Sequence, residues 1–334
     1  MLAKGNLGVP GWDSPAIISN MERHHSHTIT VRSAQRHELA HLYSTDPNGH
    51  SNADRHRPDQ KFIEAALQGG VRPEELLLAW EEGEVVGMGL IRVTTGRLAA
   101  VWPPSVMRSS RPDQVARVLA EAYLQRLQHW GIQVAQLLLS PWDRKQAEPL
   151  LKIGFRWITE LDHFSRSLVP GVSCSTERDR NCLRLVLSDE KDPRFSSLLG
   201  QTYVGSRDCP ELNEWRSLSD VLDDYATMAT GGLSRWWLLV ADDQPVGVAL
   251  FISVPESTTA ELVYFGLIPE ARGKGLATAA LRAIIDWATK EKFSAILLAV
   301  DRRNDPARTL YLREDFQFLD RDDVYLWTPD PGVA

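Results

Sequence analysis

The stretch ELVYFGLIPEARGKGLAT, residues 261–278, decides the fold of this 334-residue chain. It begins with an apolar run of strand-favouring residues and enters a tight basic turn that contains Gly273 and Gly275. A helical pattern starts directly after the turn, with apolar residues spaced three and four apart. A strand, a glycine turn and a helix N-terminus in this order predict an anion-binding site, because unpaired N–H groups and the positive end of the helix dipole converge there.

Two common nucleotide-binding motifs do not fit this turn. A P-loop requires Ser or Thr after Gly-Lys, whereas Gly275 follows Lys274. A dinucleotide-binding fingerprint requires a third glycine at the position of Thr278. Arg272, Gly275 and Ala277 instead satisfy the pattern Arg-x-x-Gly-x-Ala, which resembles the pyrophosphate loop of the GCN5-related N-acetyltransferases, the GNAT superfamily. An ordinary basic helix N-terminus without a ligand is the alternative.

A second stretch, NDPARTLYLREDF at residues 304–316, carries the same resemblance. It is similar to the family's second cofactor element, Asn-x-x-Ala-x-x-Leu-Tyr-x-x-x-Gly-Phe. Ala307, Leu310 and Tyr311 would share one face of a helix, because they are spaced three and four residues apart. Asp315 stands in place of the family's glycine, and we expect the turn to survive because Asp tolerates the left-handed conformation better than most residues.

The resemblance implies how the cofactor is bound. In the family, acetyl-CoA lies in a splayed gap between the fourth and fifth strands, here residues 260–268 and 295–300, and it serves as co-substrate without a metal. Tyr311 matches the tyrosine that protonates the departing thiolate. The resemblance assigns cofactor binding to Phe265, Gly266, Leu267, Arg272, Gly273, Lys274, Gly275, Leu276, Ala277, Asn304 and Ala307.

The general base is expected to be a carboxylate, because all nine histidines lie in the first half of the chain. Glu261 opens the fourth strand, where several family members place a glutamate base, and it could act through a water molecule. Its alternative role is that of a solvated residue at a strand start. A water on the ligand side, or His163 or His129 of the first half, is the alternative base.

The segment between the first and third strands of the second half shapes the acceptor site in this family. It is dense in polar and aromatic residues for a mere connector. We therefore expect Tyr203, Asp208 and Asn213 to bind the acceptor, with capping and turn chemistry as the alternative. Cys209 has no evident basic partner and is not expected to act as a nucleophile.

An internal repeat divides the chain. Val86-Gly87 recurs 160 residues later, and Arg111 and Phe155 each recur 161 residues later. A period this long indicates two copies of one domain. We predict an α+β fold of two tandem GNAT-like domains, each a mixed, mostly antiparallel sheet flanked by helices, similar in architecture to mycothiol synthase. The predicted parts are an irregular arm at 1–26, a degenerate GNAT-like domain at 27–168, a linker at 169–181 and a catalytic GNAT domain at 182–334.

The first copy lacks the cofactor-binding residues of the second. An offset of 161 puts Gln114, Leu150 and Asp143 at the positions of the helix-start glycine, the tyrosine and the asparagine. Pro112 and Asp113 occupy the glycine–lysine positions, so the loop would present a carboxylate to a pyrophosphate. We expect this copy to have lost CoA binding, to extend the sheet and to wall one side of the acceptor site.

Composition narrows the partners. Residues 1–170 carry 19 basic and 18 acidic residues, and residues 171–334 carry 18 and 26. The total of −7 argues against a nucleic-acid binder. No apolar run approaches the ~18 residues of a membrane span, no signal peptide is evident, and three scattered cysteines indicate the cytoplasm. We expect a monomer or homodimer that acts on a small-molecule amine or a peptide N-terminus; the acidic second half favours a cationic acceptor.

A competing motif is HELAH at residues 37–41. It could bind zinc through His37 and His41 and use Glu38 as a base, but Ser44 and Pro47 replace the Gly and His of the extended metzincin motif. We predict instead an N-acetyltransferase that transfers an acetyl group from acetyl-CoA to a primary amine by direct attack in the second half. A non-catalytic CoA-binding sensor or scaffold is the alternative, and a zinc hydrolase is the remote one.

Overall fold

The computed structural model of the protein describes residues 28–35, 37–38, 72–107, 109–229, 232–253 and 257–329. The chain divides into two compact units, Met1–Leu90 with Pro104–Leu124 and Ile91–Pro103 with Gln125–Ala334. Much of the first sequence half thus groups with the second. The predicted arm at 1–26 lies outside the described residues, and the end of the predicted linker is helical, in α5 (Glu177–Cys182).

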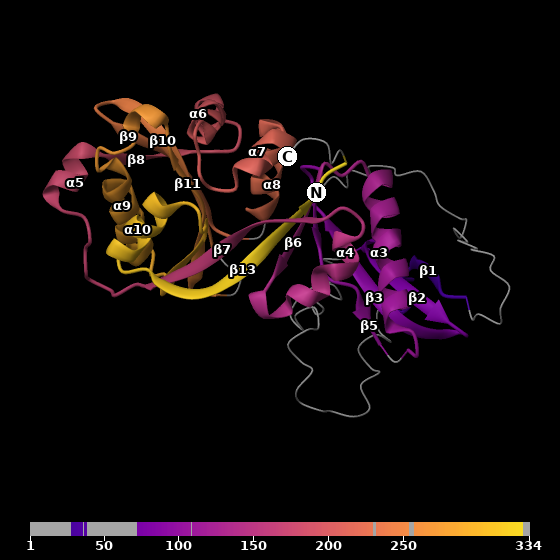
Figure 1. Cartoon of the computed structure of the whole chain (residues 1–334). Coiled ribbons are helices and arrows are strands. Elements are labelled where there is room, and N and C mark those ends of the chain that lie inside the picture. Colours follow the sequence, from indigo (N-terminus) through magenta and orange to yellow (C-terminus); the bar gives the residue numbers. More distant parts are fainter. Residues whose placement is uncertain are drawn as a thin grey trace, which may run out of the picture. The chain divides into compact units, whose positions relative to one another are not determined.

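The first unit is a small antiparallel sheet with one helix packed against it (Figure 1). Its elements are β1 (Thr30–Ser33), η2 (Pro73–Glu75), β2 (Leu76–Glu81), β3 (Glu84–Val93), β5 (Ser105–Val106) and α3 (Pro112–His129). β2 pairs with β1 and β3, and β5 pairs with β3. Gly89 leaves room for the buried ring of Tyr123. The Tyr123 hydroxyl oxygen accepts a hydrogen bond from the N–H of Leu90 at 2.6 Å.

The second unit is built on one mixed sheet. From one edge to the other, the strands are the last residues of β3, then β4 (Leu98–Val101), β6 (Val134–Leu139), β13 (Gln317–Trp327), β7 (Arg156–Ser167), β12 (Ala295–Asp301), β11 (Thr259–Leu267), β10 (Gln244–Ser253), β9 (Ser234–Ala241) and β8 (Arg184–Ser188). The pairs β4–β6 and β11–β12 are parallel, and all the others are antiparallel. The sheet is mixed and mostly antiparallel, as predicted.

The last strand of each sequence half pairs with the other half. β7 belongs to the first half but pairs with β12, and β13 belongs to the second half but pairs with β6. The two strands also pair with each other and form the long ribbon seen in Figure 1. From apolar pattern alone, residues 155–158, 163–168, 316–319 and 324–328 would be four separate strands. They form only two, because partners on both sides keep β7 and β13 continuous.

Helices cover both faces of this sheet around β9 to β12. On one, called the α9 face, α9 (Leu276–Lys290) and α10 (Asp305–Arg313) pack on apolar residues of β11 and β12. On the other, called the α6 face, α6 (Pro193–Tyr203) and α8 (Leu218–Met228) pack on β9 and β10. The remaining helical elements of the unit are η3 (Pro141–Ala147), α4 (Glu148–Leu151), α7 (Pro210–Trp215) and η4 (Pro269–Ala271).

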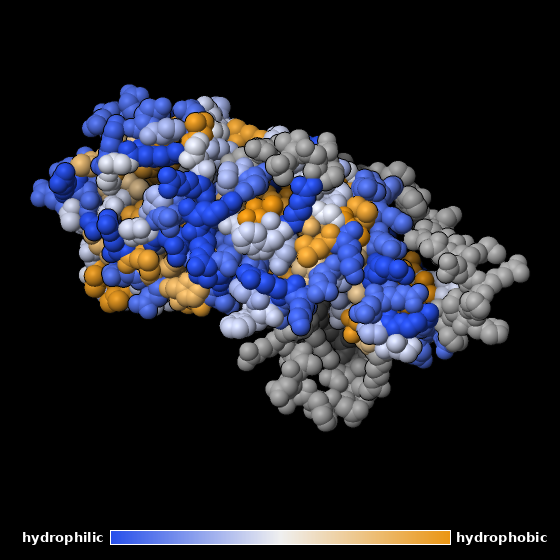
Figure 2. Space-filling view, viewed as in Figure 1, coloured by the Kyte–Doolittle hydropathy of each residue, from blue (hydrophilic) through white to orange (hydrophobic). Residues whose placement is uncertain are grey.

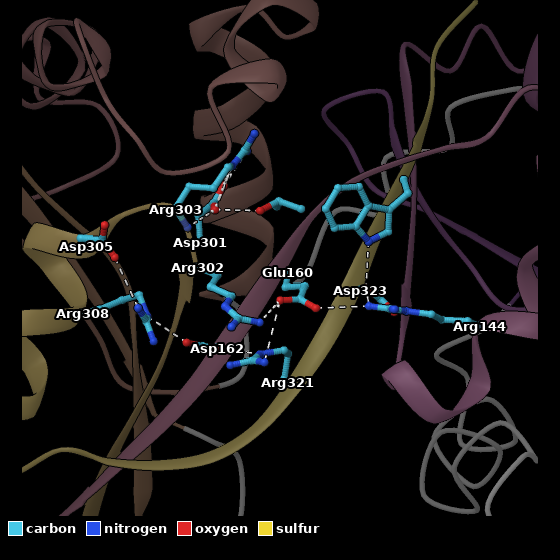
Figure 3. Close-up of polar contacts among 12 residues, drawn as sticks. Arg144, Glu160, Asp162, Asp301, Arg302, Arg303, Asp305, Arg308, Arg321 and Asp323 are labelled. Atoms are coloured by element: carbon cyan, nitrogen blue, oxygen red, sulfur yellow. Dashed lines mark hydrogen bonds and ion pairs between the residues drawn. The ribbon is translucent and has the colours of Figure 1, made fainter.

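Buried ion pairs fasten the exchanged strands (Figure 3). Asp162 of β7 accepts hydrogen bonds from Arg308 of α10 at 2.8 Å and from Arg321 of β13 at 2.6 Å. Asp323 of β13 is likewise buried and pairs with Arg144. The carboxylates of Asp162 and Asp323 are buried, whereas their arginine partners keep part of their side chains in solvent. The arginines therefore supply the charge that these two buried carboxylates need.

On the face seen in Figure 2, the region around α5 and α9 is mostly hydrophilic, with hydrophobic residues in separate patches. Across the residues that the structure describes, no helix combines the length and the apolar composition needed to cross a membrane.

Candidate active site

The gap between β11 and β12 is the first feature of the site. These parallel strands pair over only three residues, ending at Glu261 and Leu297, although β11 runs on for six residues and β12 for four. Beyond this point β11 still pairs with β10. Its other edge faces no strand in the described part of the chain, so the backbone of Phe265, Gly266 and Leu267 has no strand partner on that side.

The turn after β11 is shaped for an anion. Gly273 and Gly275 have φ values of +74° and +80°, where a side chain would strain the backbone. Gly275 is the N-cap of α9 and supplies no side-chain acceptor. The N–H groups of the first turn, which starts at Leu276 and Ala277, are therefore not capped by a side chain. Lys274 is exposed and adds a positive charge.

Arg272 is engaged by the protein itself. Its guanidinium donates to the carbonyl oxygens of Leu267 at 3.0 Å, Thr202 at 2.8 Å and Gly205 at 3.3 Å. These carbonyls belong to the end of β11 and to the end of α6 with the loop that follows it. The side chain therefore fixes the acceptor segment against the strand that borders the gap, and any contact with a pyrophosphate must share it with these three bonds.

Tyr311 lies on the buried side of α10. Its ring is 6 % exposed and packs against Phe164 and Phe316. Among the described residues its hydroxyl makes no hydrogen bond. Burial raises the pKa of Tyr311, and the charge of Asp208 acts in the same direction. The hydroxyl therefore stays protonated at neutral pH and is available as a donor.

The rest of the second motif shapes the ends of α10. The side chain of Asn304 caps the helix by accepting a hydrogen bond from the N–H of Ala307 at 3.4 Å. Asp315 adopts φ +58°, the left-handed conformation that the sequence predicts for this position. The N–H of Phe316 then donates to the Tyr311 carbonyl at 3.0 Å. The side chain of Asn304 therefore serves as the N-cap of α10 in this structure.

Glu261 lies where β11 and β12 separate, and its side chain is partly buried. Burial raises the pKa of Glu261, while the nearby His163 lowers it. His163 reaches this position because β7 pairs with β12. The sequence suggests His163 only as one of several bases, since the pairing that brings it here is not local.

The loop after α6 is tied to the end of β12. The carboxylate of Asp208 accepts a hydrogen bond from the N–H of Asp301 at 2.7 Å, and the N–H of Cys209 donates to the Asp301 carboxylate at 3.0 Å. Burial raises the pKa of the Cys209 thiol, in keeping with its expected inertness. Asn213 lies in α7, and its side chain is outside the described residues.

Aromatic residues line the α6 face beside this loop. The rings of Tyr203 and Tyr264 meet edge to face with 5.7 Å between their centroids. The hydroxyls of Tyr264 and Thr202 are 2.7 Å apart. Burial raises the pKa of Tyr203 to about 12. Gly266 has no side chain to push Thr202 away from β11.

A buried ion pair behind these tyrosines is missed by the sequence reasoning. Arg216 pairs with the buried Asp224 of α8, and Asp224 also accepts from the N–H of Gly96 at 3.1 Å. A side chain at Gly96 would collide with the carbonyl of Asp220. The turn between β3 and β4 therefore packs directly against α8. In the sequence, the only trace of this contact is the glycine at position 96.

The HELAH motif is described only at His37 and Glu38. Glu38 pairs with Arg32, which donates to it at 2.8 Å and lowers its pKa to about 2. In the ranges that the structure covers, no group of three or more His, Cys, Asp or Glu side chains could hold a metal ion. His41 lies outside them.

Comparisons with known proteins agree on one family. The model of the acetyltransferase (GNAT) family matches residues 36–155 and 201–316. N-acetylaspartate synthetase from Homo sapiens is 29 % identical over 101 residues, 30 % of this chain and 32 % of that protein; the Rattus norvegicus protein is also 29 % identical over 101 residues, 33 % of its length. The chain therefore spans about a third of the curated relatives it matches.

Two solved structures share the fold over most of the chain. A GCN5-related N-acetyltransferase from Sphaerobacter thermophilus superposes with a TM-score of 0.60 at 16 % identity. The match covers 91 % of this chain and 97 % of the Sphaerobacter chain. A tandem GNAT protein from the clavulanic acid biosynthesis pathway has a TM-score of 0.50 at 16 % identity, with 78 % and 83 % covered. At these identities the likeness concerns the fold alone.

Proposed function

The chain belongs to the acetyltransferase (GNAT) family, and from this premise we propose that it is a CoA-dependent N-acetyltransferase, which binds acetyl-CoA in its second half and acetylates a primary amine. The tandem α+β architecture expected from the repeat is confirmed. On this proposal residues 182–334 are the catalytic domain, and residues 27–168 are a degenerate copy without CoA binding.

The gap between β11 and β12 carries the proposal. Its open strand edge can pair with the amide groups of the pantetheine arm. The glycine turn at the end of β11 offers helix N–H groups and Lys274 to a pyrophosphate. Tyr311 of α10, the helix that follows β12, has a hydroxyl without a hydrogen-bond partner among the described residues. We take the glycine turn as the anion site, the free edge of β11 as the pantetheine site and Tyr311 as the proton donor.

The proposed chemistry uses two side chains for proton transfer. The acceptor nitrogen attacks the acetyl carbon, the new C–N bond forms, and the C–S bond breaks to release CoA as a thiolate. Tyr311 donates its proton to that sulfur. Glu261, directly or through a water, first takes a proton from the substrate ammonium, so that the neutral amine can attack. The nitrogen loses its second proton as the tetrahedral intermediate collapses, and a proton from solvent restores Tyr311. Proton transfer of this kind contributes about 10²–10⁴-fold to a rate.

The acceptor is proposed by class only. The acidic second half favours a cationic amine or a peptide N-terminus, whereas the name of the curated relative, N-acetylaspartate synthetase, points to an amino acid. Tyr203, Asp208 and Asn213 are the proposed acceptor-binding residues. Asp208 and Tyr203 lie on the loop and helix that Arg272 holds against β11, which supports a shared role in forming this wall.

The test has two stages. Isothermal titration with acetyl-CoA is expected to give saturable binding to one site per chain, and no binding would overturn the proposal. Release of free CoA thiol is then followed with a panel of polyamines, aminoglycosides, amino acids and peptides, and the acetylated product is identified by mass spectrometry. Saturable binding without transfer to any amine would favour the CoA-binding sensor instead.

A further inference from the structure

The exchange of β7 brings a histidine of the first half to the catalytic sheet. In the strand register, Glu261 of β11 is opposite Leu297 of β12, and Ala299 of β12 is opposite His163 of β7. His163 is thus on the strand beyond β12. Along β12 its partner lies two residues past the partner of Glu261, in the direction in which β11 and β12 separate. No residue of the second half could place an imidazole there.

The two side chains share the α6 face. Ala260 and Leu262, which flank Glu261, pack into the core of the α9 face, and so does Phe164, which follows His163. Because neighbouring side chains alternate between the faces of a sheet, Glu261 and His163 project together to the opposite face. This is the face on which α6 carries Tyr203.

The strand between them leaves room for an interaction. Ala299 is exposed and presents only a methyl group. Strands two apart are separated by about 9–10 Å at the backbone, a span that a glutamate and an imidazole can shorten by leaning over that methyl group. Each of the two groups acts electrostatically on the other.

A second carboxylate orients the imidazole. The Nε2 atom of His163 is 2.9 Å from Oδ2 of Asp322 on β13. This hydrogen bond raises the pKa of His163 most, burial opposes it, and the charges of Asp322, Asp320 and Glu261 add to the increase. The charged groups that face the ring from β11 and β13 are therefore all acidic, and together they favour the imidazolium form.

We propose that His163, anchored by Asp322, is a positioning residue of the acetyltransferase site: its positive charge keeps Glu261 ionised and ready to accept the proton of the incoming amine. This inference rests on the proposed function. Glu261 is driven toward its neutral form by burial, and a neutral carboxyl group cannot act as a base. The first half thereby supplies a working part of the second half's site.

The coupling can be measured without turnover. NMR titration of the His163 imidazole is compared in the wild type, in Glu261→Gln and in Asp322→Asn. Because the interaction is mutual, the pKa of His163 is expected to fall in both variants, and more in Asp322→Asn. An unchanged His163 titration in Glu261→Gln would overturn the inference, whatever the enzyme's activity.

Kinetics test the consequence for the base. The acid limb of the pH profile of kcat/KM reports ionisation of Glu261. In His163→Gln this limb is expected to move to higher pH by about 0.5–1 unit, because a cation at this distance has been lost. In His163→Lys, which keeps a positive charge, the limb is expected to stay at or below its wild-type position.

A matched control separates charge from structure. Ser165→Ala changes a neighbouring uncharged residue on the same strand and face, and it is expected to leave the limb in place. An acid limb that moves equally in Ser165→Ala and His163→Gln, or that moves in neither, would overturn the role of His163 while leaving the acetyltransferase proposal intact. If the wild-type protein transferred no acetyl group to any amine, the acetyltransferase proposal itself would be overturned.

Discussion

The turns that enter α3 and α9 occupy equivalent places in the two copies, yet they are built for different purposes. Arg272 binds three carbonyl oxygens and fixes the acceptor segment, whereas Arg111 pairs with Glu81 of its own sheet. Two positive-φ glycines precede α9, whereas α3 begins with Pro112, which has no N–H to offer. The equivalent arginines therefore differ in what they join: Arg272 connects the end of β11 to the segment after α6, whereas Arg111 connects the start of α3 to β2.

A second contrast concerns two tyrosines, one in each copy, which do not occupy equivalent positions. The hydroxyl oxygen of Tyr123 on α3 accepts a hydrogen bond from the N–H of Leu90, whereas the hydroxyl of Tyr311 on α10 has no hydrogen-bond partner among the described residues. The Tyr311 hydroxyl oxygen is not fully buried, so it can remain without a protein partner. Tyr123 therefore uses its hydroxyl within the fold, whereas the hydroxyl of Tyr311 is available to a ligand, as the proposed function requires.

The largest expected effect follows from this difference. Tyr311→Phe is expected to lower kcat by about 10²–10⁴-fold, because the proton donor to the thiolate is lost, with little change in the Kd of acetyl-CoA. Thiol-release kinetics and calorimetry measure the two quantities. Tyr123→Phe serves as the control, with turnover at the wild-type level. A Tyr311→Phe enzyme that retains full turnover would remove Tyr311 from the mechanism.

The two turns predict the next effect. Lys274→Glu is expected to raise the Kd of acetyl-CoA about tenfold, since a charge beside the helix N-terminus changes sign and about 1.4 kcal/mol is lost. Arg111→Glu is expected to leave that Kd unchanged and to lower the melting temperature, because two carboxylates would then face each other. Equal Kd changes in both variants, measured by calorimetry at low and high salt, would erase the distinction between the turns.

Local pattern was enough to predict the secondary structure around the proposed site. The glycine turn, the helix that follows it and the α10 motif are contiguous in sequence, so their residues reveal their geometry: α9 starts at Leu276, and Asp315 takes the left-handed conformation. The splay of β11 and β12 could be expected only through the family resemblance. Periodicity alone gives strands without saying where their pairing stops.

Nonlocal pairing defeated the sequence reasoning elsewhere. Nothing in the residues of β7 or β13 states that each will pair with the other copy, because strand partners are chosen by burial and register across the whole sheet. His163 pairs with Ala299 of β12, and the N–H of Gly96 donates to Asp224 of α8; both contacts join residues far apart in the sequence. The ion pairs of Figure 3 become visible for the same reason only in three dimensions.

The third prediction concerns stability at the two tyrosines. Tyr123→Phe is expected to lower the free energy of unfolding by about 1–3 kcal/mol, because the N–H of Leu90 would be buried without an acceptor. Tyr311→Phe removes a hydroxyl that has no hydrogen-bond partner in the described chain, so its stability should change little. Urea unfolding followed by tryptophan fluorescence measures both. A larger loss in Tyr311→Phe would mean that its hydroxyl is structural.

The smallest effect is expected in the turns that follow α4 in the first copy and α10 in the second. An offset of 161 pairs Asp315 with Gly154, which has φ +104° and lies against Trp327. Asp315→Gly is expected to change the unfolding free energy by less than about 1 kcal/mol, since glycine removes left-handed strain but adds chain entropy. It also loses only an exposed ion pair with Arg166, which is 3.5 Å away and of the kind that contributes about 0–1 kcal/mol.

The reciprocal change is expected to be the harmful one. Gly154→Asp places a side chain at a φ that only glycine adopts readily, and its Cβ would come within 3.3 Å of the Trp327 ring. A loss of at least about 1–2 kcal/mol is expected. Paired thermal melts measure both variants. If Gly154→Asp melted at the wild-type temperature, the first copy would tolerate the residue of the second copy, and backbone strain would not explain the glycine at position 154.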